Sequence, residues 1–150
     1  MSNEDIQKLV DRYVDVSFSV TKKAEALITE QLGSNLTHDQ LYILRYINRV
    51  GSCTSTALSD EFEVKKSAIT AIINRLWEKG FILRTRDEKD RRVVYLALTE
   101  KGEDLFWKID ERIHHLVQGL ISQFEPSEIV QFIETYEKLN HVLIDLKNKS

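Results

Sequence analysis

Residues 76–102 read "LWEKGFILRTRDEKDRRVVYLALTEKG", and their centre is unusually charged. The nine residues 84–92 hold five positive and three negative side chains, so this part cannot lie in a hydrophobic core. Two short strand-like runs, 81–86 and 93–99, lie at its two ends. The pattern predicts an antiparallel β-hairpin with a charged tip.

The charge of the chain is unevenly distributed around this hairpin. Residues 65–92 carry nine Lys and Arg against four Asp and Glu, whereas the rest of the chain carries 12 positive and 20 negative side chains. The net charge of −3 hides this contrast. A basic segment on an acidic chain is typical of a local surface that binds a polyanion.

Apolar residues recur at steps of three and four on both sides of the hairpin, which predicts helices. The expected helices cover residues 4–32, 37–51, a short stretch within 54–64, 65–79, 103–124 and 126–148. Thr37 and Gln40 have the spacing of a capping box, and Gly33, Gly51 and Gly80 follow expected helix ends.

This order of elements predicts a mainly α fold with a small β-hairpin, namely a winged helix-turn-helix. We expect a single domain over residues 1–150, in which 36–101 form the winged lobe. The helices 4–32 and 103–148 have apolar stripes that so small a lobe cannot cover. A second copy of the chain would cover these stripes, and the helices 4–32 and 103–148 would then form a dimerisation region. An intramolecular helical bundle is the competing interpretation.

The helix 65–79 has one apolar face and one face of short polar or small residues. With Ile69, Ile72, Ile73 and Leu76 inward, no acidic residue stands between Glu63 and Glu78. A helix fits the major groove, whose width is about 12 Å, and short polar side chains read base edges there. The predicted DNA contacts of this helix are Lys65, Lys66, Ser67, Thr70, Ala71, Asn74 and Arg75. A plain solvated face is the alternative.

The hairpin places a basic finger beside that helix. An arginine at such a tip can enter the minor groove, where the negative potential is deepest. Asp90 would repel phosphate, so we expect it to hold a neighbouring guanidinium in place. The predicted wing residues are Arg84, Arg86, Lys89, Asp90, Arg91 and Arg92.

Taken together, "LTHDQLYIL" at 36–44, the segment from "ALSDEFEV" at 57 through "LALTEKG" at 102, and the flanking helices resemble the multiple-antibiotic-resistance regulator (MarR) family. The resemblance covers essentially the whole chain. It implies a homodimer on a pseudo-palindromic double-stranded DNA operator, and repression relieved by an effector. It also implies that Arg92 is the minor-groove arginine, that Asp90 positions it, and that Ser67, Thr70 and Asn74 face bases.

The signal to which such a regulator would respond is open. The single cysteine, Cys53, is most simply a buried residue, although a thiol switch is an alternative. We expect no metal site, because His114 and His115 point about 100° apart on a helix and cannot easily share one ion. A small-molecule effector is the remaining candidate. Aromatic and His side chains that could line its cleft are Tyr13, Phe18, His38, Tyr42 and Tyr46, which are as compatible with plain packing.

Other functions have weaker signals. The chain has no motif of a catalytic nucleophile, phosphate loop or zinc protease, so we expect no enzyme and no cofactor. A winged-helix module that binds proteins is the alternative from another class. No apolar run approaches the roughly 20 residues of a membrane span, and a lone cysteine fits a reducing compartment, so we expect a cytoplasmic location and no membrane partner.

Overall fold

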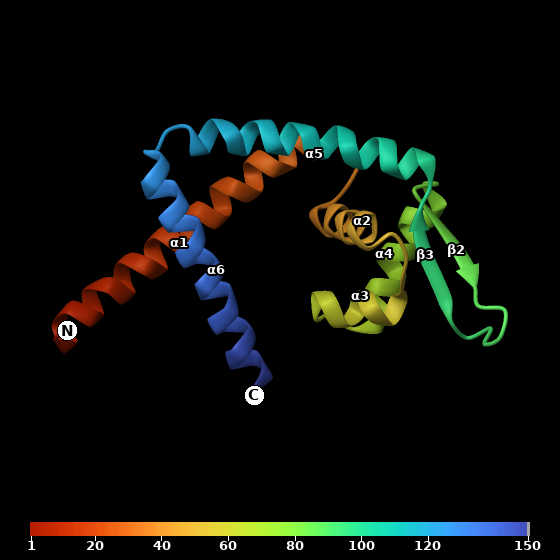
Figure 1. The fold of residues 1–150 in the computed structure, drawn as a ribbon, viewed down its shortest axis with the longest axis horizontal. Helices are drawn as coiled ribbons and strands as arrows, with labels where there is room; N and C mark the ends of the chain where they lie inside the picture. The colour runs from red at the N-terminus through yellow and green to blue at the C-terminus, as the bar shows by residue number, and fades with distance from the viewer. Residues whose placement is uncertain (150) are drawn as a thin grey trace. The chain divides into compact units, whose positions relative to one another are not determined.

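The computed structural model describes residues 1–149 of the chain. Its elements in chain order (Figure 1) are α1 (Asn3–Leu32), α2 (His38–Val50), β1 (Cys53–Thr54), α3 (Ser55–Phe62), α4 (Lys66–Glu78), β2 (Ile82–Arg86), β3 (Val94–Leu98), α5 (Glu100–Ile121) and α6 (Pro126–Asn148). The fold is mainly helical with a small antiparallel sheet, and it is the predicted winged helix-turn-helix.

The helix ends follow the local signals in the sequence. The Thr37 side chain accepts a hydrogen bond from the Gln40 amide, and the Gln40 side chain accepts one from the Thr37 amide, so the predicted capping box is confirmed. Gly33 ends α1 at φ 59°, and Gly51 ends α2 at φ 85°. Positive φ favours glycine, which is why both helices stop there.

The sheet has one strand more than the hairpin that the sequence predicted. Its order is β1-β3-β2, with Cys53 opposite Leu96 in the pair of β1 and β3. The prediction missed β1 because a strand of two residues shows no alternation of polar and apolar side chains. In addition, the Thr54 hydroxyl accepts from the Ala57 amide and caps α3, so these residues looked like a helix start.

The core of the winged part is formed by helices α2 to α4 and the sheet. Ile69, Ile73 and Leu76 of α4 are buried as predicted, whereas Ile72 is only partly buried. Leu96 of the central strand β3 is fully buried. One face of α4 is therefore packed in the core, and its other face is exposed to solvent.

The start of α5 is fastened to the end of α4. The Thr99 hydroxyl donates to the Gly80 carbonyl at 2.6 Å and accepts from the Gly102 amide at 2.9 Å. Because Thr99 caps the helix in this way, α5 begins at Glu100, three residues before the predicted start. Gly102 lies directly against the Phe81 backbone, where a Cβ would collide with the Phe81 carbonyl group.

The chain divides into two compact units, one from Met1 to Glu111 and one from Arg112 onward, so that α5 crosses the division. In the first unit, the Arg45 guanidinium lies 3.8 Å from the buried Asp110 carboxylate and links α2 to α5. Leu32 is the only buried residue of α1, and α6 has none within Pro126–Asn148. None of the helices in residues 1–149 combines the length and apolar character that a membrane crossing requires.

We expect Gly102→Ala to lower the free energy of unfolding by about 1–3 kcal/mol, because the new methyl group must displace the Phe81 backbone. Gly119→Ala is the matched control in the same helix, since no neighbouring atom lies within 4 Å of the place that its new methyl group would occupy. It should leave stability unchanged or raise it by about 0.5–1 kcal/mol. Urea titrations at one protein concentration measure both, and equal stability of the two variants would contradict the close approach.

Candidate nucleic-acid interface

The exposed face of α4 carries the short polar residues that the sequence placed there. Lys66, Ser67, Thr70 and Ala71 are exposed, and Asn74 is partly buried. The Thr70 hydroxyl donates to the Lys66 carbonyl at 2.8 Å. The hydroxyl proton is therefore used within the helix, and Thr70 offers its surroundings a methyl group and an acceptor oxygen.

The N-terminus of α4 suits an anion. Its N-cap residue is Lys65, and no side-chain hydrogen bond caps the first turn in the described structure. The first amide groups of a helix carry the positive end of the helix dipole and lack partners within the helix. Together with Lys65 and Lys66, these amides can hold a phosphate group.

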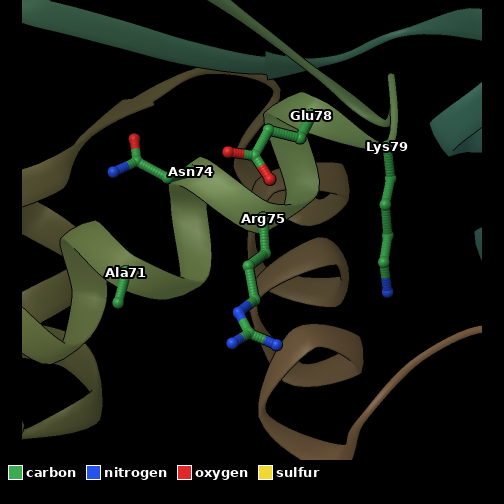
Figure 2. A pocket seen from close by; sticks show the side chains of 5 residues that line it. All are labelled: Ala71, Asn74, Arg75, Glu78 and Lys79. Atoms are coloured by element: carbon green, nitrogen blue, oxygen red, sulfur yellow. The ribbon is translucent and has the colours of Figure 1, made fainter.

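Farther along α4, five residues line a surface pocket, shown in Figure 2: Ala71, Asn74, Arg75, Glu78 and Lys79. The Asn74 and Lys79 side chains leave the helix on opposite sides of this view. The Lys79 ammonium group donates to the Asn35 carbonyl at 3.1 Å and to the Gln40 side chain at 3.3 Å. Lys79 is thus part of the fold, while Ala71, Asn74 and Arg75 belong to the side that the sequence assigned to DNA.

The tip between β2 and β3 is organised by Asp87. Its carboxylate accepts hydrogen bonds from the Lys89 amide at 2.8 Å and from the Tyr95 hydroxyl at 3.2 Å. The Lys89 amide is the main reason why the pKa of Asp87 lies below its usual value, and the bond to Asp87 raises the pKa of Tyr95. Neither Asp87 nor Tyr95 is among the predicted wing residues, although their contact shapes the tip.

Arg92 and Asp90 form a two-pronged ion pair at the same tip. Arg92 Nε and Nη2 lie 3.1 and 3.2 Å from the two carboxylate oxygens of Asp90, and the Arg92 amide also donates to Asp90. The Arg92 side chain donates these bonds and thereby lowers the pKa of Asp90. Although it is held in this way, the Arg92 side chain is 90% exposed. It is an oriented cation at the surface.

The remaining basic residues of the wing have different surroundings. The Arg84 guanidinium lies 4.2 Å from the centre of the Trp77 ring and donates to Asn74 at 3.0 Å. Arg86 donates to the Arg91 carbonyl at 2.8 Å. Arg84 and Arg86, predicted as DNA contacts, thus bind other parts of the wing and α4. Lys89 and Arg91 have exposed side chains.

The residues named for an effector cleft lie in separate clusters. Tyr13 and Phe18 are exposed on α1. His38 bonds to Thr29 and contacts the edge of the Tyr42 ring, whereas Tyr46 contacts Phe62 and Arg49. The cleft stays a prediction.

Cys53 lies in β1, an edge strand of the small sheet. It is buried, and burial raises the pKa of its thiol. A thiol that stays protonated is a poor nucleophile, so these surroundings are typical of a packing role. Among the residues that the structure describes, no three His, Cys, Asp or Glu side chains converge on a metal position.

Comparison with known proteins finds relatives of one kind. A family model described as the MarR family matches residues 36–94. The HTH-type transcriptional repressor MdtR of Bacillus subtilis (strain 168) is 30% identical over 129 residues, which are 83% of each chain. A second regulator from that organism, YwhA, is 35% identical over 98 residues, covering 65% of this chain and 70% of its own.

Solved structures agree with these sequence relatives. Streptococcus pneumoniae FabT in complex with DNA has a TM-score of 0.81 and 27% identity, and the match covers 91% of this chain and 99% of FabT. The MarR family transcription regulator SP03579 has a TM-score of 0.85 at 18% identity and supports the fold alone.

We expect Arg92→Ala to weaken binding of a duplex from the gene's own promoter by about 1–3 kcal/mol, because an oriented cation at the tip is lost. Thermal unfolding should be unchanged, since this side chain is exposed. Lys108→Ala, which removes an exposed charge of α5, is the control and should bind as the unmodified chain does. Titration by fluorescence anisotropy measures both, and identical curves for the two variants would contradict the assignment of Arg92.

Proposed function

The chain belongs to the MarR family of DNA-binding transcriptional regulators, and on this premise we propose that it is a homodimeric repressor of a pseudo-palindromic operator, released by an effector. One observation carries the proposal most directly. The Arg92 side chain is 90% exposed, yet Asp90 holds it in one orientation. The wing that carries it lies beside α4, whose first three turns contain no acidic residue.

In this proposal α4 enters the major groove and the wing enters the adjoining minor groove. Lys65, Lys66 and the first amides of α4 bind phosphates, while Ser67, Thr70 and Asn74 face bases. Asp90 does not face a phosphate, because both of its oxygens bind the Arg92 guanidinium. The similarity to FabT, which was solved in complex with DNA, supports DNA binding by this chain.

The apolar faces of the terminal helices support a homodimer. Large hydrophobic residues of α6 are at least 40% exposed: Val130, Phe132, Ile133, Tyr136, Val142, Leu143, Ile144 and Leu146. The helix α1 likewise exposes Ile6, Leu9, Val10, Tyr13, Val14, Val16, Phe18 and Val20. So much exposed apolar surface marks an interaction site, and a second copy offers a matching one.

A dimer also explains how release would work. Two α4 helices related by a two-fold axis bind half-sites about one DNA turn, roughly 34 Å, apart. An effector that prefers a different spacing would shift the population away from the binding form. The relative MdtR is named a repressor, which favours repression over activation. The burial of Cys53 favours a small molecule over a thiol switch as the signal.

The decisive experiment is a titration with the promoter duplex at rising salt. We expect specific binding whose affinity falls about 1,000-fold or more between 50 and 200 mM salt, because a dimer with two basic modules displaces many counterions. A scrambled duplex of equal length is the control and should bind more weakly. A module that recognises proteins would bind neither duplex, and that result would reject the proposal.

Leu143→Glu should convert the dimer to a monomer, since a charge would enter the apolar face of α6. Operator affinity should fall about 100-fold or more, because the second half-site is no longer linked to the first. The control is Lys138→Glu, which places the same side chain on the polar face of α6 between Glu134 and Asp145. Analytical ultracentrifugation gives the assembly state. An unchanged dimer for Leu143→Glu would show that this face is not the interface.

A further inference from the structure

Arg84 joins the wing to α4 through two side chains one helical turn apart. Its guanidinium group lies 4.2 Å from the centre of the Trp77 ring, and its Nη1 donates to Asn74 Oδ1 at 3.0 Å. Side chains alternate along a strand, so Arg84 lies on the same side of β2 as the buried Ile82, although Arg84 itself is exposed. The alternation sets the side of β2, and the contacts with Trp77 and Asn74 show that Arg84 extends toward α4.

The chemistry of arginine fixes the orientation of the Asn74 amide. A guanidinium group has five N–H donors and no acceptor, so the atom of Asn74 that faces it must be the oxygen. The Nδ2 amino group then points away from Arg84. Asn74 is partly buried, which is consistent with a side chain supported on one side and open on the other.

Resting on the proposed function, we propose that Arg84 is a positioning residue that sets which base Asn74 selects. A free asparagine reads adenine with two bonds, accepting from N6 with its oxygen and donating to N7 with its amino group. In this chain the bond from Arg84 holds the oxygen on the wing side of Asn74, so the Nδ2 amino group is the part of the amide that is turned to the base. Asn74 therefore reads as a donor, and it selects a base edge that offers an acceptor.

This arrangement changes the expected base preference. Guanine and adenine both present N7 as an acceptor in the major groove, and guanine adds O6. An Asn74 that only donates can therefore bind adenine and guanine alike. It does not form the bond from adenine N6 that would distinguish adenine from guanine. Trp77 contributes by holding the guanidinium plane through a cation–π contact, so that the Asn74 amide keeps this orientation.

The test measures binding of Arg84→Met to operator duplexes that carry each base pair in turn. The position read by Asn74 is found first, as the one where Asn74→Ala loses discrimination. At that position the unmodified chain should bind adenine and guanine within about threefold of each other, and Arg84→Met should favour adenine about tenfold. The double variant Arg84→Met with Asn74→Ala should show no such shift.

Two outcomes would overturn the proposal. In the first, Arg84→Met binds all duplexes more weakly by one factor with a smaller salt slope, as expected for a lost phosphate contact. In the second, the adenine-to-guanine ratio is the same with and without Arg84. Arg84→Lys is a second variant that keeps the charge but lacks the planar fork; it should show the adenine shift at nearly normal nonspecific affinity. Failure of the unmodified chain to bind any promoter duplex would instead reject the proposed function.

Discussion

The positions of α4, the wing and α5 all depend on the contact between Thr99, Gly102 and the chain at Gly80–Phe81. The Thr99 hydroxyl group donates to the Gly80 carbonyl just after α4, and it also caps α5 by accepting from the Gly102 amide. The Phe81 carbonyl accepts from the Thr99 amide, and the Phe81 amide donates to the Leu76 carbonyl within the last turn of α4. Gly102 permits the two backbones to meet because it has no Cβ. Any shift of the first turn of α5 must therefore move the end of α4 and the base of the wing with it.

The basic side chains of the winged lobe have three different structural roles, although they form one continuous basic segment in the sequence. Arg92 is paired yet exposed, Arg84 and Arg86 bind neighbouring groups of the protein, and Lys79 fastens α4 to the capping box of α2. A simple count of positive charge therefore overstates the number of direct contacts available to a polyanion. It also hides the role of Asp87, whose carboxylate gives the tip a defined shape.

Much of this architecture could be predicted from the sequence because its signals are local. The helices were predicted from the periodicity of apolar residues, from the Thr37–Gln40 capping box and from the glycines after α1 and α2. The hairpin was predicted from the charged segment between two strand-like runs. The strand β1 was missed because its evidence is a pairing with β3, distant in sequence. The contact of Arg84 with α4 was missed for a different reason. The alternation from the buried Ile82 would have placed Arg84 on the inner face, but its charge suggested a side chain directed outward.

The strand order leaves β2 at an edge of the sheet, and within residues 1–149 no strand pairs with its side away from β3. Such an edge is a template for pairing with the same strand of another molecule, and Leu83 is an exposed apolar residue on it. Arg84 and Arg86 place two positive charges on this short strand, so a second copy brought alongside would be repelled. The charges of the wing therefore disfavour edge-to-edge pairing of two copies, whether or not nucleic acid is present.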